Sequence, residues 1–303
     1  MNLKIPKDIK FSPFYKKLNI VSFGLIVLSI CFLFFKGLNF GVDFKGGTLI
    51  ELRVKDKTVT ITNIRDSLNQ INLGDVSVKK FGKEDDYLIK FEKKDFNNPN
   101  FISEIKGKLT SSLGNTFEFR RVENVGPKVS SELLKSGVIA ISLSLAAMLI
   151  YIWIRFEWQF SLGAILALFH DIIITLGIFS FLSLEINLSI VAAVLTIVGY
   201  SMNDTVVIFD RVRENLKKFS DVEIFDLTNI SINETLSRTI ITSATTLLAL
   251  LSIYIFGGEI LKGFSLAMIL GVIFGTYSSI YIANPVLILF KVSQKTILKE
   301  EKD

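Results

Sequence analysis

Residues 186–209 read INLSIVAAVLTIVGYSMNDTVVIF, an apolar run with a single charged side chain, that of Asp204. As an α-helix this run would be about 36 Å long, because each residue adds about 1.5 Å along the helix axis. That length exceeds the ~30 Å hydrocarbon core of a bilayer, where a carboxylate is costly. The run therefore predicts a membrane-spanning helix that carries a buried acidic residue.

Five further runs have the same apolar character: Leu18–Phe35, Ser136–Ile154, Trp158–Leu184, Thr239–Gly258 and Gly263–Phe290. The whole chain is 50% hydrophobic, with a mean hydropathy of +0.49. This composition excludes a disordered chain, and a single cysteine excludes a disulfide-stapled secreted fold. We expect an α-helical polytopic membrane protein with six transmembrane helices.

The first run follows two lysines, as the core of a cleaved signal peptide does. Its 18 residues are long for such a core, and no alanine precedes Ala140, so an A-x-A cleavage site is missing. We therefore expect a retained signal-anchor helix.

Lysine and arginine residues near the ends of the runs predict the orientation, because cytoplasmic loops are enriched in them. Fifteen lie on the side of both termini, whereas the opposite short loops, Ser183–Asn187 and Gly257–Gly263, hold only Lys262. Both termini are thus predicted to be cytoplasmic. The expected parts are a cytoplasmic N-terminal tail at 1–17, a first transmembrane helix at 18–37, an extracytoplasmic head domain at 38–134, a five-helix membrane bundle at 135–290 with a cytoplasmic loop at 210–237, and a cytoplasmic C-terminal tail at 291–303.

The head domain has the pattern of an α+β fold, with four segments of strand character and two with helical spacing of apolar residues. In chain order we expect a strand at Thr48–Val54, a helix at Thr58–Ile71, strands at Asp75–Phe81 and Tyr87–Glu92, a helix at Pro99–Leu113 and a strand at Thr116–Val125. This β-α-β-β-α-β order is that of a ferredoxin-like domain. Between Leu38 and Leu134, 16 basic and 14 acidic residues form a mixed surface, so no nucleic-acid partner is expected.

Asp204 is expected about 10 Å inside the cytoplasmic flank, too deep for its short side chain to reach water. Tyr200 and Ser201 precede it by four and three residues, share its helical face and could hydrogen-bond to it. Arg238, at the start of a later run, is the expected counter-ion.

Five hydroxyl side chains follow Arg238, at Thr239, Thr242, Ser243, Thr245 and Thr246. Thr242 lies on the same helical face as Arg238, so the stripe could line a hydrated path for protons toward Asp204. The hydroxyls could instead bond to carbonyls of their own helix, with Asp204 and Arg238 forming a structural ion pair. The sequence leaves both interpretations open.

His170 and Asp171 interrupt the third run. Adjacent helical residues point about 100° apart, so we do not expect these two side chains to face one partner in a single contact. His170 could titrate near neutral pH, or it could be a packing residue that holds a neighbouring helix. One histidine and one aspartate are too few for a metal site. Motifs for nucleotide binding, hydrolysis or metalloprotease activity are missing, so we expect neither an enzyme nor a bound cofactor.

Several motifs resemble those of the SecD/SecF protein-export membrane proteins. They are FGVDFKGGT at 40–48, VGP at 125–127, HD at 170–171, GYSMNDT at 199–205, FDRVREN at 209–215, RTIITS at 238–243 and FGG at 256–258. The GYSMNDT motif and its DRVREN extension are similar to the SecF branch rather than the SecD branch. The motifs span most of the chain in the order expected of that branch.

The resemblance implies a half-sized set of helices from a proton-coupled machine of the RND superfamily, in the bacterial cytoplasmic (inner) membrane. It implies a SecD-like partner that acts with this chain on the SecYEG translocon, YajC and YidC as further candidate partners, and exported polypeptides moved with the proton-motive force. Asp204 would correspond to the proton-carrying aspartate of the family, and Arg238 and Thr242 to its partners in the transport path. The supporting residues of this candidate site are Tyr200, Asn203, His170 and Asp171.

Two other functions remain open. A proton-driven exporter of small molecules would need a larger extracytoplasmic domain than the fewer than 100 residues available here. A passive scaffold linking a SecD-like protein to the translocon would use Asp204 and Arg238 only as a structural pair.

Overall fold

The computed structural model describes residues 9–55, 59–69, 76–91, 101–114, 117–219, 222–294 and 296. The chain divides into two compact units. The membrane unit comprises the chain up to Asn39 and from Ile139 onward, and the inserted unit comprises Phe40–Val138. Residues 1–8 of the predicted N-terminal tail, and residues 295 and 297–303 of the predicted C-terminal tail, lie outside the described residues.

Six helices are long and apolar enough to cross a membrane, which confirms the predicted number of spans. They are α1 (Tyr15–Phe35), α5 (Pro127–Arg155), α6 (Trp158–Phe181), α7 (Leu188–Lys218), α8 (Ile224–Phe256) and α9 (Glu259–Ser278). The short η1 (Ser12–Phe14) precedes α1, and α9 continues through the π-helical η2 (Ser279–Ala283) into α10 (Asn284–Leu289). The two-residue strands β1 (Asn39–Phe40) and β6 (Glu185–Ile186) follow α1 and α6. The amide of Asn39 donates a hydrogen bond of 3.0 Å to the carbonyl of Ser183.

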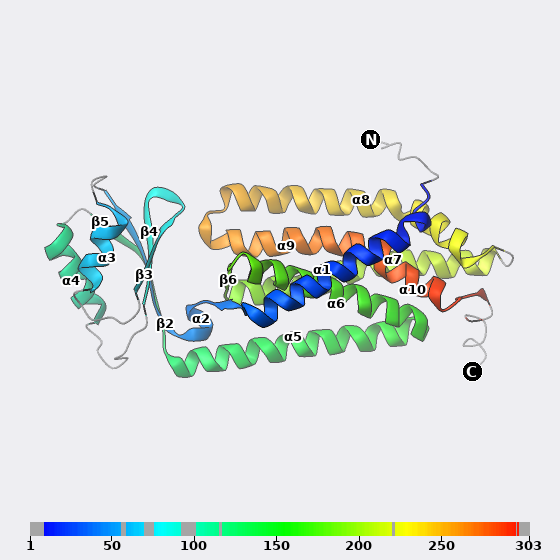
Figure 1. Cartoon of the computed structure of the whole chain (residues 1–303), viewed down its shortest axis with the longest axis horizontal. Helices are drawn as coiled ribbons and strands as arrows, with labels where there is room; N and C mark the ends of the chain where they lie inside the picture. Colours follow the sequence, from blue (N-terminus) through cyan, green and yellow to red (C-terminus); the bar gives the residue numbers. More distant parts are fainter. Residues whose placement is uncertain are drawn as a thin grey trace. The chain divides into compact units, whose positions relative to one another are not determined.

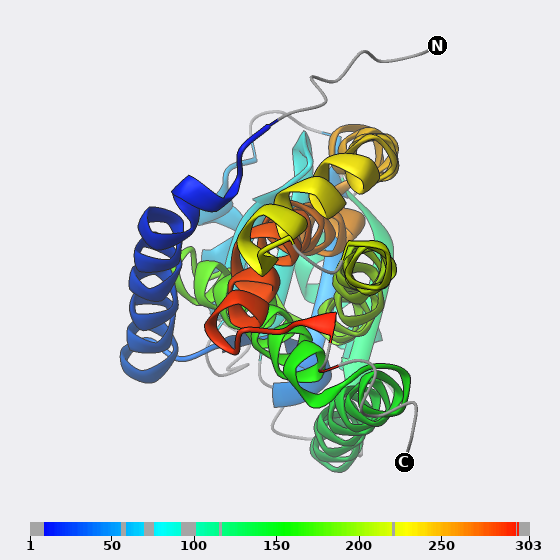
Figure 2. The same cartoon turned by 90° about the vertical axis from the view of Figure 1, so that its right-hand side faces the viewer.

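The end-on view in Figure 2 places α6 and α9 centrally and α1 and α5 at the periphery of the membrane unit. About half or more of the apolar stretches of α6, α7 and α9 is buried, whereas those of α1, α5 and α8 are mostly exposed. Glycines allow the central helices to approach closely. An added Cβ atom at Gly275 of α9 would lie 3.0 Å from the Cβ of Ser201 on α7, and one at Gly163 of α6 would lie 2.7 Å from the carbonyl oxygen of Ala283.

Most of the segment 210–237, predicted as the cytoplasmic connection between two spans, is helical. Residues 210–218 continue α7, and residues 224–237 belong to α8. Apolar residues recur here at helical spacing and are buried in the core, among them Val212, Leu216 and Leu227. The charges occupy the other face of each helix.

Side chains of the motif at 209–215 form ion pairs between this end of α7 and neighbouring segments. Asp210 pairs with Arg155 at 2.9 Å, and Arg213 pairs with Glu157 at 3.1 Å. Arg211 binds Glu234 of α8 at 2.6 Å. These ion pairs give the run of charges at 209–215 a structural role at the helix ends.

The inserted unit contains α2 (Val42–Lys45), β2 (Gly47–Val54), α3 (Ile61–Asn69), β3 (Val76–Phe81), β4 (Lys83–Phe91), α4 (Phe101–Leu113) and β5 (Phe117–Val125). The four longer strands form one antiparallel sheet in the order β3-β4-β2-β5, with a register shift between Glu51 and Leu52. Figure 1 shows α3 and α4 on the same side of this sheet. Their apolar faces bury Ile64, Leu68, Ile105 and Leu109 completely against it. The predicted element ends at Thr58, Ile71, Asp75, Glu92, Pro99 and Thr116 lie outside the described residues.

The glycine pair at 46–47 joins two of the sequence motifs within the inserted unit. Gly46 has φ = +78° and Gly47 has φ = +123°, a backbone region that side chains disfavour. An added Cβ atom at Gly46 would lie 3.1 Å from the Oγ of Ser130 and 3.3 Å from the carbonyl of Val125. The first motif therefore needs glycine where it packs against the VGP turn at 125–127.

Candidate functional site

Asp204 is buried inside the membrane unit, with 3% of its surface exposed. Its Oδ2 accepts from the hydroxyls of Ser243 on α8 at 3.5 Å and Thr276 on α9 at 3.4 Å. Asn203 contacts Oδ1 at 3.5 Å. Ser243 and Thr276 are themselves hydrogen-bonded at 2.8 Å, so the site joins three helices around one carboxyl group.

All three contacts of Asp204 are long for hydrogen bonds, and hydroxyl bonds to an ionised carboxylate are usually about 2.5–2.7 Å. Within the described part of the chain, Asp204 makes no ion pair. A buried carboxylate with such long contacts lacks the short hydrogen bonds or the ion pair that would stabilise its negative charge. The geometry suits a group that changes its protonation state more than one that fixes two helices.

Arg238 is exposed and, among the described residues, forms no ion pair with Asp204. The direct counter-ion contact suggested by the sequence is therefore not formed in this conformation. Thr242 donates to the carbonyls of Arg238 and Thr239, each at 3.0 Å, and Thr245 bonds to its own helix in the same way. Only Ser243 of the predicted hydroxyl stripe reaches Asp204.

Of the two residues expected beside Asp204 on α7, Ser201 instead donates to Asp171 at 2.5 Å. The Tyr200 hydroxyl is buried and has no hydrogen-bond partner among the described residues. Sharing a helical face brought these groups near one another, but the neighbouring helices decided which partner each one meets.

His170 and Asp171 form a hydrogen bond with each other. His170 Nδ1 lies 2.8 Å from Asp171 Oδ1, and both side chains are fully buried. Their Cβ atoms diverge as expected, but rotation about the side-chain bonds turns the imidazole back toward the carboxyl group. Asp171 Oδ2 also accepts from Ser278 of α9 at 2.8 Å.

Sequence reasoning missed three hydroxyl groups that face α6 and α7, those of Thr276 and Ser278 on α9 and of Ser279 at the start of η2. Thr276 contacts Asp204, and the Ser279 hydroxyl lies 3.0 Å from that of Thr205. The available signal was the hydroxyl-rich run 276–279 inside an apolar span. Ser279 is also the first residue of the π-helical η2, and its carbonyl accepts from the side-chain amide of Asn284 at 2.7 Å. Such wide helical turns are frequent at functional sites.

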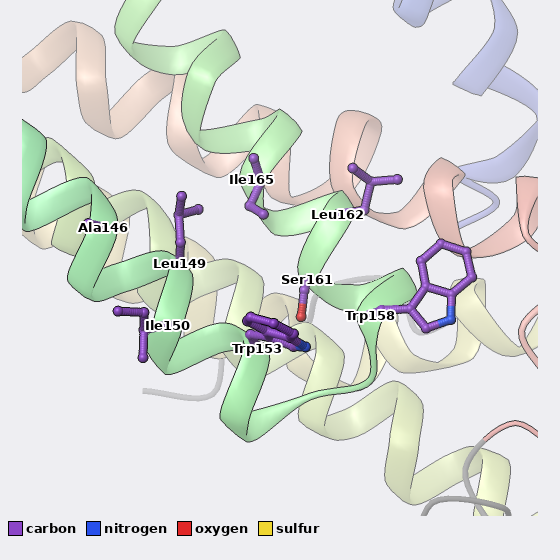
Figure 3. A pocket seen from close by; sticks show the side chains of 8 residues that line it. All are labelled: Ala146, Leu149, Ile150, Trp153, Trp158, Ser161, Leu162 and Ile165. Carbon is purple, nitrogen blue, oxygen red and sulfur yellow. The ribbon is translucent and has the colours of Figure 1, made fainter.

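A groove of about 540 Å³ lies between α5 and α6 (Figure 3). Ser161 is the only polar residue among the eight that line it. The Ser161 hydroxyl donates to the carbonyls of Ile152 and Glu157, at 3.2 and 3.3 Å, rather than into the groove. This lining offers no titratable group, and its exposed Trp153 and Trp158 suit contact with lipid rather than with protons.

In the inserted unit, two charged groups have shifted pKa values. Arg53 donates from Nε and Nη2 to both carboxylate oxygens of Asp86, at 2.6 and 2.7 Å, and this bidentate pairing raises the pKa of Arg53. Burial and, to a smaller extent, the charge of Lys79 lower the pKa of Lys90 to about 8. Groups of three or more His, Cys, Asp or Glu side chains that could hold a metal do not occur among the described residues. The candidate site therefore lies in the membrane unit.

The sequence matches two family profiles. Residues 32–58 match the SecD/SecF GG motif, and residues 105–293 match the C-terminal family of the protein export membrane proteins SecD/SecF. The chain belongs to the SecD/SecF family. The SecD/SecF C-terminal match includes α6, α7, α8 and α9, and thus both buried carboxyl groups.

Two curated SecD/SecF relatives cover nearly the whole chain. The protein translocase subunit SecF of Rickettsia bellii is 45% identical over 93% of this chain and 93% of its own length. The protein translocase subunit SecF of Vibrio alginolyticus is 42% identical over 98% of this chain and 94% of its own length.

Solved structures of SecDF have the same fold. The crystal structure of SecDF, a translocon-associated membrane protein from Thermus thermophilus, matches with a TM-score of 0.82 at 34% identity. SecDF in its super-membrane-facing form matches with a TM-score of 0.71 at 33% identity. The first match covers 96% of this chain but 40% of the SecDF chain, so this SecD/SecF family member spans about two fifths of that protein.

Proposed function

We propose that this chain is the SecF subunit of a SecDF complex, which assists SecYEG-dependent export of polypeptides and is powered by the proton-motive force. In this proposal Asp204 takes up and releases the driving protons. The observation that carries it is the burial of Asp204 among long hydroxyl contacts from α8 and α9, with no ion pair in the described part of the chain.

The energy scale supports this role. Moving one charge through 100 mV provides ~2.3 kcal/mol, close to the ~2.5–3.5 kcal/mol cost of a charged residue at the centre of a membrane helix. Protonation of Asp204 would remove that cost and alter its bonds to Ser243 and Thr276. A shift of a few kcal/mol changes the populations of two helix arrangements severalfold or more. Arg238 and Thr242 would enter the path in the other arrangement.

The proposal assigns a SecD-like protein as the partner that supplies the other membrane half, as in an RND-type machine. The match to about two fifths of a SecDF chain supports this assignment. SecYEG, YajC, YidC and exported polypeptides are the further partners we propose, and the chain itself would be no enzyme. The strand order β3-β4-β2-β5, with two helices on one face, supports a ferredoxin-like inserted unit outside the cytoplasm.

Reconstitution with and without a SecD-like protein tests the proposed function. Vesicles that contain SecYEG, this chain and the partner should export a substrate faster when a proton gradient is imposed. Vesicles with this chain alone should not respond, because only one half of the proton path is present. Proton-dependent export by the chain alone would contradict the proposal.

Thiol labelling tests the proposed orientation, after Cys31→Ser has removed the single natural cysteine. A maleimide that cannot cross the membrane should label Lys80→Cys, on exposed β3, in intact cells. It should label Lys217→Cys, exposed at the end of α7, only after the membrane is permeabilised. The opposite pattern would show that both termini lie outside the cytoplasm.

A further inference from the structure

His170 and Asp171 form a second buried polar centre, separate from the contacts of Asp204. Asp171 is fully buried and accepts hydrogen bonds from three side chains: His170 on its own helix, Ser201 on α7 and Ser278 on α9. His170 stacks on Tyr277, with ring centroids 5.8 Å apart. The Tyr277 hydroxyl contacts Ser22 of α1 at 2.7 Å, so four helices meet at this centre.

The hydrogen-bond inventory places the exchangeable proton on the imidazole. The hydroxyls of Ser201 and Ser278 donate to Asp171 Oδ2, which leaves Oδ1 to accept from His170 Nδ1. With Asp171 ionised, its carboxylate can only accept, and Nδ1 then carries the hydrogen. His170 Nε2 is buried and has no partner among the described residues, so it is the ring atom free to gain or lose a proton.

Burial of the Asp171 carboxylate favours such a proton. Asp171 makes no contact with lysine or arginine in the described part of the structure. A buried carboxylate without a cation is costly, and the imidazolium ion is the one cation within reach. The titratable groups that contact His170 are Asp171 on α6 and Tyr277 on α9, whereas α7 contributes only the hydroxyl of Ser201 to Asp171. The face of Tyr277 also favours a positive ring.

We propose that His170 and Asp171 form a second proton-binding site, which gains its proton at His170 Nε2 and is coupled to Asp204 through α7 and α9. Binding converts a net negative pair into a neutral imidazolium–carboxylate pair, and release reverses this. The coupling follows from shared helices: Ser201 and Asp204 lie on α7, and Ser278 and Thr276 lie on α9. Proton binding at His170 does not depend on the proposed function, whereas its coupling to Asp204 rests on that function.

The test exploits the fact that His170 is the only histidine of the chain. Nitrogen-15 labelling of histidine gives one imidazole in the NMR spectrum of the full chain in lipid nanodiscs. We expect Nδ1 to stay protonated while Nε2 gains a proton as the pH falls from about 8 to 5. An Nε2 signal that does not change over this range would overturn the proposal.

Two variants should move this titration in opposite directions. Asp171→Asn removes the negative charge, so proton binding at Nε2 should weaken at least tenfold, about one pH unit. Ser278→Ala removes a hydrogen bond to the carboxylate and keeps the pair, so the site should hold its proton to higher pH. Ser252→Ala, exposed on α8 and bonded to its own helix, is the matched control and should leave the titration unchanged. Equal titrations in wild type and Ser278→Ala would contradict the assignment even if Asp171→Asn failed to fold.

Asp204→Asn tests the coupling separately. Loss of a nearby carboxylate should shift the His170 titration to lower pH, whereas an unchanged titration would overturn the coupling. Export measurements on the same variant report on the proposed role of Asp204, so the failure of one idea is distinguishable from the failure of the other.

Discussion

Replacing Asp204 by asparagine is expected to abolish the stimulation of export by a proton gradient while leaving the chain inserted and bound to its partner. Asparagine has nearly the same size and can still accept from Ser243 and Thr276, but it cannot titrate. If one proton moves through about 100 mV, the lost drive of ~2.3 kcal/mol corresponds to a decrease of up to about 50-fold. Export rate and complex yield should be measured on the same vesicles.

Asp210→Asn is the matched control, because it removes another carboxylate from the same helix. Asp210 is half-exposed and pairs with Arg155 at 2.9 Å, and such surface pairs contribute only about 0–1 kcal/mol. Its proton-dependent export should remain close to wild type. A passive scaffold predicts a different result for Asp204→Asn, in which export falls only as far as complex yield falls. Normal yield together with normal proton-dependent export would refute the proton-carrying role.

Gly177→Leu is expected to destabilise the membrane unit more than any other single glycine substitution on α1 or α6. An added Cβ atom at Gly177 of α6 would clash with the Ser29 side chain and lie 2.7 Å from the Ser29 Cα atom. Because backbone rather than a flexible side-chain end is in the way, α1 must move away from α6. Overpacking of this kind costs ~1–3 kcal/mol and more when helices separate. A lower Tm of the Gly177→Leu variant than of the wild type in nanodiscs would report this loss of stability.

Gly24→Leu provides the control on the facing helix. Gly24 of α1 is exposed, and an added Cβ atom there would meet nothing within 4 Å. The same substitution at this position adds apolar surface toward the lipid without moving α1. Equal Tm values for Gly177→Leu and Gly24→Leu would show that the close approach of α1 and α6 does not stabilise the unit.

Much of the architecture is determined by local sequence. Lipid offers no hydrogen bonds, so a spanning segment must be helical and apolar, and the six spans can be predicted from composition alone. The order of strands and helices in the inserted unit follows from the spacing of apolar residues such as Ile64 and Leu68. Asp204 stands out for the same reason, because a carboxylate in an apolar run is costly and rarely occurs without a function.

The tertiary structure decided which partners the buried carboxyl groups meet. Spacing along one helix defines a face, but the rotation of a neighbouring helix depends on contacts such as Gly275 against Ser201, which local patterns do not encode. For this reason Asp204 meets Ser243 and Thr276 instead of Arg238, and Ser201 binds Asp171 instead of Asp204. The sequence by itself determined that acidic side chains lie inside the membrane unit. Only the packing of α7 and α9, set by small residues that let their backbones approach, decided that one carboxyl group is held loosely and the other tightly.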